Sequence, residues 1–234
     1  MRLDESHPSK RLALWLLGVL CLVPATQTAV TVYWQIGPGF LYPLMKLVMI
    51  AAVIGGWWWM GLSRRELVNR IGWRRPRPIA AIGIGALMAA VMLGAYYLVL
   101  IDRLDPAPVL AKARALNLAE HYALFAAVIA LGNAAFEEFY WRAFLVGEFR
   151  QRFSAVWTCI AGGTLFGLHH IFALAPLFPV GWTGLFVLGT MAAGAVWTLM
   201  RIRGLSIWDC YISHVGADLA ILWMGYDLLV RAAV

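Results

Sequence analysis

Hydrophobic residues follow one another along this chain in long, almost unbroken stretches, and polar residues are confined to short segments between them. An apolar stretch of about 20 residues is long enough to cross the hydrocarbon core of a bilayer as a helix. We identify seven such stretches, at residues 12–33, 40–62, 79–101, 122–144, 155–177, 181–200 and 205–230. They are too long and too uniformly apolar for barrel strands. The sequence therefore predicts an all-α, polytopic membrane helix bundle.

Composition leads to the same class of protein. Of the 234 residues, 62% are hydrophobic and only 13% are charged, whereas soluble domains are about 45–50% apolar and roughly 25% charged. Almost the whole chain is therefore expected to lie in the bilayer, as one integral membrane domain.

The charge distribution predicts the topology. The net charge is +7, and arginines concentrate in alternate connecting segments, above all in "SRRELVNRIGWRRPRP" at residues 63–78. Because short cytoplasmic loops carry an excess of Lys and Arg, we expect the N-terminus inside and the C-terminus outside. Topology and attraction to anionic membrane lipid explain the basic surplus, so no nucleic-acid partner is expected.

Two other features of the apolar stretches have alternative interpretations. The first stretch, with Lys10 and Arg11 before it and "PATQTA" inside it, also has features of a cleaved signal peptide. The apolar pattern resumes at "VTVYW", however, which favours a full span. The cysteines lie inside spans without paired spacing and are typical of small core residues: Cys21, Cys159 and Cys210.

Ionisable residues inside the spans gather in the second half of the chain. A charged group at the bilayer centre costs at least about 2.5–3.5 kcal/mol on insertion scales, so such residues face the bundle interior and usually serve function. They are Glu137, Glu138, Arg142, His169, His170, His214 and Asp218. In the first half only Lys46 lies well inside a span, and it is expected to reach the outer surface by snorkelling. We therefore expect a scaffold at residues 1–121, with three spans and an outer amphipathic loop, and a catalytic core of four spans at residues 122–234.

Helical spacing sharpens this expectation. At about 1.5 Å of rise per residue, the polar residues of the three spans reach the middle third of the membrane, so one shared site is geometrically allowed. Glu138 and Arg142 are four residues apart in the favourable order for an ion pair, which leaves Glu137 to point into a cavity. Asn133 lies one turn before Glu137 and could orient it. Gly163 and its neighbours Gly162 and Gly167 allow another helix to come close.

Residues of these types suit hydrolysis. A glutamate can act as a general base toward water, while imidazoles hold the water, protonate a leaving amine or stabilise an oxyanion. Alternatively, Glu137, His170 and His214 form a reasonable ligand set for zinc with an open position for water. The sequence has no serine nucleophile elbow and no HExxH motif.

Three short motifs carry a family resemblance. "EEFYWR" (137–142) matches EExxxR, "FGLHH" (166–170) matches FxxxH, and "HVGAD" (214–218) is similar to HxxxN. In this order, on separate late spans, they resemble the CAAX-protease and bacteriocin-processing (CPBP, or Abi) family of intramembrane endopeptidases. The resemblance covers roughly residues 122–224.

The resemblance implies a helical membrane protease that cuts near the C-terminus of a membrane-associated peptide or protein. The catalytic residues would be Glu137, Glu138, Arg142, His170, His214 and Asp218, and the substrate-binding ones Phe166, His169 and Asn133. Glu137 would activate water with His170, while His214 and Asp218 would bind the oxyanion. Family members are described as glutamate-type or metal-dependent, so zinc stays an open cofactor. A bacterial or archaeal inner membrane is the expected location.

Two departures from the family pattern need comment. Asp218 stands where asparagine is common, and three ionised carboxylates against Arg142 alone would be costly, so we expect Asp218 to carry a proton. Neighbouring positions on a helix point about 100° apart, so at most one of His169 and His170 is expected to face the site. The FxxxH pattern favours His170.

Other function classes fit parts of the pattern. The acids and histidines could form a proton or metal path in a transporter, although they form one cluster and no inverted repeat accompanies them. A non-catalytic immunity protein could bind a membrane peptide in the same cavity. A Glu–Arg pair can also be only a structural tie.

Overall fold

The computed structural model describes residues 14–118 and 120–232, and within these ranges the chain is helical with no strand. Position 12, the predicted start of the first span, lies outside the described residues. The elements are α1 (Leu14–Thr28), η2 (Ala29–Tyr33), α2 (Leu41–Trp59), α3 (Arg64–Ile71), α4 (Pro78–Ala95), η3 (Tyr96–Leu100), α5 (Ala107–Ala115), α6 (Tyr122–Ala127), η4 (Val128–Asn133), α7 (Ala134–Glu137), η5 (Glu138–Leu145), α8 (Val146–Arg150), α9 (Ala155–Leu174), α10 (Val180–Ile202) and α11 (Ile207–Arg231). The all-α prediction is confirmed.

Six helical stretches of the described chain are long and apolar enough to cross a membrane. They are Leu14–Tyr33, Leu41–Trp59, Pro78–Leu100, Tyr122–Arg150, Ala155–Leu174 and Val180–Ile202. The seventh predicted span corresponds to α11, which has 25 residues but carries Asp209, Asp218 and Asp227 and is not among the six. The prediction of seven spans is thus confirmed for six, and the orientation of the termini stays a prediction.

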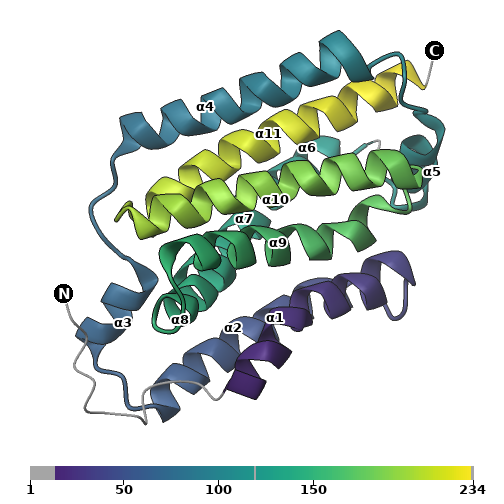
Figure 1. Ribbon diagram of the computed structural model, residues 1–234. Coiled ribbons are helices and arrows are strands. Elements are labelled where there is room, and N and C mark those ends of the chain that lie inside the picture. Colours follow the sequence, from purple (N-terminus) through teal and green to yellow (C-terminus); the bar gives the residue numbers. More distant parts are fainter. Residues whose placement is uncertain (1–13, 119, 233–234) are drawn as a thin grey trace.

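The helices lie roughly side by side (Figure 1). α9 packs along α10, and α11 packs along α4, while α1 contacts α9. α3 and the start of α11 lie at one end of the bundle, and α5 and the end of α11 lie at the other (Figure 1). Polar connections therefore occupy both ends, and the apolar lengths of the helices lie between them.

Glycines set the closest helix contacts. A Cβ built on Gly163 of α9 would lie 2.6 Å from the carbonyl oxygen of Met191 in α10, and one on Gly85 of α4 would lie 3.0 Å from Cα of Ser213 in α11. No larger residue fits at either crossing without a shift of backbone. The close approach predicted from the α9 glycines is confirmed, and the partner is α10.

Two connecting segments contain short helices. The loop at 102–121, which is expected on the outer side, holds α5, and the arginine-rich segment at 63–78 holds α3. Ser63 and Glu66 form a capping box at the start of α3. Arg70 of α3 hydrogen-bonds the buried carboxylate of Glu148, which also accepts from Arg152 at 2.9 Å. α3 is therefore tied to the end of α8.

The fourth span is one long helix, Tyr122–Arg150, interrupted by two π-helical segments, η4 and η5. It continues six residues past the predicted end at 144, because the buried Glu148 is neutralised by its arginine partners. A π-helical turn is wider than an α-helical turn and is often found at functional sites. Here η4 and η5 flank Glu137, a feature that the sequence pattern did not indicate.

Candidate active site

The structure brings the three motifs together. Glu137 ends α7 and Glu138 begins η5, the two neighbouring histidines lie in α9, and His214 lies in α11. The carboxylates are deeply buried, with 4% of Glu137 and 1% of Glu138 exposed. Residues from three separate predicted spans thus share one interior site.

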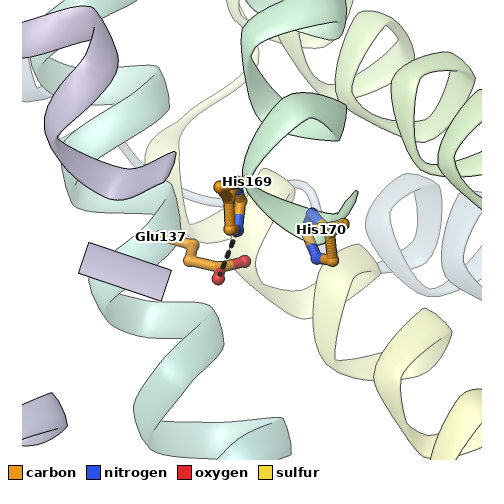
Figure 2. A group of neighbouring side chains, drawn as sticks. All are labelled: Glu137, His169 and His170. Atoms are coloured by element: carbon orange, nitrogen blue, oxygen red, sulfur yellow. Dashed lines mark hydrogen bonds and ion pairs between the residues drawn. The ribbon is translucent and has the colours of Figure 1, made fainter. Parts of the chain in front are cut away.

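The two oxygens of Glu137 have different surroundings. Oε1 accepts a hydrogen bond from Nδ2 of Asn133 at 3.0 Å and lies 3.3 Å from Nε2 of His169. Oε2 lies 3.7 Å from Nε2 of His214. Figure 2 shows the carboxylate beneath the His169 ring, with His170 on the next position of the same helix. One oxygen is therefore held in place, and the other faces α11.

Both α9 histidines face the site, so the expectation that only one would do so is wrong. Their ring centroids are 4.0 Å apart, and ligand atoms of Glu137, His169 and His170 lie within 4.8 Å of one another. His169, and not the His170 favoured by the motif, contacts the carboxylate. Its ring is stacked at 16° on Trp141, which turns it toward η5. His170 hydrogen-bonds the Phe166 carbonyl through Nδ1 at 2.9 Å, which leaves its Nε2 for other partners.

Glu138 contacts both His214 and Arg142. Its Oε1 lies 2.8 Å from Nδ1 of His214 and 3.5 Å from Nη1 of Arg142. Arg142 also donates from Nη2 to the carbonyl oxygen of Gly194 at 3.3 Å. The expected Glu138–Arg142 contact is present. Because the carboxylate fixes Nδ1, it sets the direction in which Nε2 of His214 points.

Aromatic rings enclose the guanidinium and the imidazole. Arg142 lies over the rings of Phe166 and Trp197, at 4.4 and 5.0 Å from their centroids, and His214 is stacked on Trp197 at 4.1 Å. Only 1% of Phe166 is exposed, and its expected contact with substrate stays a prediction. Trp197 was missed, because a tryptophan in an apolar span gives no separate signal.

Asp218 lies one turn beyond His214, with Oδ1 3.5 Å from Nε2 of that histidine. Its Oδ2 is buried and has no hydrogen-bond partner among the described residues. A buried polar atom without a partner is costly, so this oxygen is available to a water molecule or a reacting group.

Lys46 lies in a different place from the one that the sequence predicted. Instead of reaching the outer surface, its ammonium group hydrogen-bonds Oδ1 of Asn133 and lies 3.8 Å from Oε1 of Glu137. The polar atoms of Asn133 and Glu137 lie close enough to stabilise the ammonium group inside the bundle. The first half of the chain is therefore more than a scaffold.

A small pocket lies beside Glu137, with room for about one water molecule. Its lining comes from α1, α2, α7, η5 and α9, and consists of Pro24, Gln27, Thr28, Tyr42, Lys46, Phe136, Glu137, Trp141 and His169. The carboxylate is therefore next to a space where a water molecule can be held.

The donor set also fits zinc in residue type. Among the described residues, ligand atoms of Glu137, His169 and His170 lie within 4.8 Å of one another, with His169 in place of the His214 expected from the sequence. His170 donates Nδ1–H to a backbone carbonyl, a common arrangement for a histidine whose Nε2 binds a metal. Carboxylate oxygen and imidazole nitrogen are both usual zinc ligands.

Comparison with known proteins agrees with the motifs. Residues 119–220 match the family model described as type II CAAX prenyl endopeptidase Rce1-like. Searches of curated proteins and of solved structures found no match. The matched region contains all three motifs, from Glu137 to Asp218. By this match residues 119–220 are similar to the Rce1-like CAAX endopeptidases, in agreement with the intramembrane protease family that the motifs resemble.

Proposed function

We propose that this protein is an intramembrane endopeptidase that hydrolyses a peptide bond near the C-terminus of a membrane-associated peptide or protein. The observation that carries the proposal is the buried carboxylate of Glu137, with Oε1 held by Asn133 and His169 and Oε2 left facing His214. A carboxylate that is fixed at one oxygen, with the other oxygen left for a reacting water, suits a general base.

In the proposed reaction, Oε2 of Glu137 takes a proton from water as the water oxygen attacks the substrate carbonyl. The C–N bond then breaks, and the proton passes to the leaving amine. His170, whose Nε2 is not used by the Phe166 contact, helps to hold the water and to return the proton. His169 holds Oε1 of the base.

The oxyanion that develops on the carbonyl oxygen requires hydrogen-bond donors. Nδ1–H of His214 donates to Glu138, so Nε2 is a proposed donor when the imidazole carries a proton on both nitrogens. Asp218, 3.5 Å from the same Nε2, is the donor instead when the proton lies on its carboxyl group. Arg142 offsets the charge of Glu138 and fixes its position.

A metal-dependent variant of this mechanism uses the same residues. If zinc binds, Glu137, His169 and His170 would hold it, and the ion would polarise a water molecule for attack. Treatment with a chelator followed by addition of zinc separates the two forms. Activity that is lost and then restored indicates a metal enzyme, and unchanged activity indicates the glutamate-type reaction.

The membrane setting of the proposal follows the topology expected from the charges. α11 would form a seventh crossing, with the N-terminus in the cytoplasm and the C-terminus outside, in a bacterial or archaeal inner membrane. The substrate would reach the site within the bilayer and carry a membrane-associated segment. Lipid is thus both the surroundings of the enzyme and the route of its substrate.

The direct test is cleavage by the purified protein in lipid vesicles, with wild type compared with Glu137→Gln. Substrates would be found by mass spectrometry of protein C-termini in cells with and without the active protein. Loss of the base should lower the rate about 10²–10⁴-fold. Glu120→Gln is the matched control, because it makes the same chemical change at an exposed position. Equal cleavage by the Glu137→Gln variant, or peptide binding without cleavage by wild type, would contradict the proposal.

A further inference from the structure

Lys46 of α2 is held deep in the bundle beside the catalytic carboxylate. Only 12% of its side chain is exposed. The ammonium group hydrogen-bonds Asn133, lies 3.8 Å from Glu137, and sits over the rings of Tyr42 and Phe136, at 4.7 and 4.6 Å from their centroids. Within the described residues, this is the one charged side chain from the first three spans that reaches the site.

A lysine in such a place requires an explanation. Lysines are almost never fully buried unless they are paired, because an ammonium group loses strong hydration there. Its four-carbon stem is long enough to direct the charge out of the bundle, yet here the charge is directed inward. Two aromatic faces and two polar partners stabilise it in that position.

The contacts form a chain from α2 to the base. Lys46 donates to Oδ1 of Asn133, and Nδ2 of the same amide donates to Oε1 of Glu137. An amide side chain has one acceptor and one donor end, so its orientation here is fixed by the lysine at one end and by the carboxylate at the other. Without the ammonium group, only the carboxylate would orient the amide of Asn133.

We infer that Lys46 is a positioning residue for the general base: through Asn133 it fixes Oε1 of Glu137 and so leaves Oε2 to the reacting water. This inference rests on the proposed function. Gln27 of α1 donates to the backbone carbonyl of Tyr42 at 2.8 Å, so α1 and α2 are also tied to each other at this depth. α1 and α2 thereby line one side of the site and help to position its base. The family match at residues 119–220 does not include these helices.

The test compares Lys46→Met, which keeps the length of the side chain and removes its charge, with Lys46→Arg, which keeps the charge. Changes to groups that orient a metal ligand typically cost about 10–100-fold, and we expect a similar cost for a group that orients a base. We expect Lys46→Met to lower kcat by about 10–100-fold with KM changed less than about threefold, and Lys46→Arg to recover most of kcat. Lys112→Met, on α5 and away from the pocket, is the matched control and should keep wild-type kcat.

A double-mutant cycle with Asn133→Leu tests the chain itself. If Lys46 acts through Asn133, the double variant should be no more than about threefold slower than the Lys46→Met variant, because residues in one network are not additive. If the two losses in kcat are additive, Lys46 does not act through Asn133. If Lys46→Met changes mainly KM, Lys46 contacts substrate and does not position the base. If Lys46→Met keeps the wild-type kcat, the inference is wrong. Asn133→Leu alone should lower kcat to a similar extent, so the relay can be judged even if Lys46→Met does not fold.

The proposed function and this inference fail in distinguishable ways. If wild type does not cleave, or if Glu137→Gln cleaves equally well, the proposed function is wrong whatever the lysine variants do. If Glu137→Gln is inactive and Lys46→Met is as fast as wild type, only the role of Lys46 is wrong.

Discussion

Replacing His169 and His170 of α9 one at a time distinguishes their roles. His169 already uses Nε2 on Oε1 of Glu137, at 3.3 Å, and so cannot hold the reacting water through that nitrogen. His170 is anchored through Nδ1 to a backbone carbonyl and keeps Nε2 for exchange with water or a leaving amine. We therefore expect different losses from two chemically identical substitutions at neighbouring positions.

The expected magnitudes follow from these contacts. His170→Ala removes a group that moves protons, which is typically worth about 10²–10⁴-fold in rate. His169→Ala removes one of two hydrogen-bonding partners of Oε1, while Asn133 stays, so a loss of about 10–100-fold in kcat is expected. His169 also stacks on Trp141, so its alanine variant should lose some thermal stability as well.

Single-turnover cleavage of a fluorescent peptide in lipid vesicles measures the chemical step without product release. Thermal unfolding of each variant in detergent separates loss of fold from loss of chemistry. Normal cleavage by His170→Ala, with an inactive but folded His169→Ala, would refute this division of roles. Equal, large losses would refute it too, and they are the result that joint binding of a metal by the two rings predicts.

Three further predictions concern the rest of the molecule. Cysteines introduced in the 64–78 loop and near the C-terminus should be labelled from opposite sides of the membrane, and labelling of both from one side would contradict the seven-span topology. Asp218→Asn should keep substantial activity, since an amide can donate to the oxyanion, whereas Asp218→Ala should lose about 10²-fold or more; an inactive, folded asparagine variant would show that Asp218 works as an anion. Glu148→Ala should lower the free energy of unfolding by about 1–3 kcal/mol, measured by thermal unfolding, because the hydrogen bonds from Arg70 and Arg152 are lost.

The helical fold and the convergence of the motifs could be predicted from the sequence because unsatisfied backbone groups and unpaired charges are costly inside a membrane. An apolar stretch must satisfy its backbone internally and becomes a helix, and a charge inside it must find a partner. From these two constraints we could predict the Glu138–Arg142 ion pair and a shared site for Glu137 and His214. They carry less information at α11, where three aspartates make the apolar signal weak.

The details that sequence reasoning missed are matters of local geometry. No glycine or proline marks η5, so nothing in "EFYWRAFL" indicates a π-helix. The directions of Lys46 and of the two histidines depend on side-chain torsions, which the position along a helix does not fix. Stacking on Trp141 brought His169 toward η5, and the polar atoms of Asn133 drew the lysine inward.

The inward lysine changes the charge balance on which the prediction for Asp218 was based. Three carboxylates now face two cations, Lys46 and Arg142, and the remaining negative charge can be removed in two ways. Either Asp218 carries a proton and donates it, or His214 carries one on each nitrogen and donates to Glu138 on one side and toward the reaction on the other. In both forms a donor points at the same place, so the oxyanion is stabilised. They differ for Asp218→Asn, because an amide replaces a protonated acid well but removes the anion that would favour a charged imidazole. The activity of that one variant therefore decides where the proton lies.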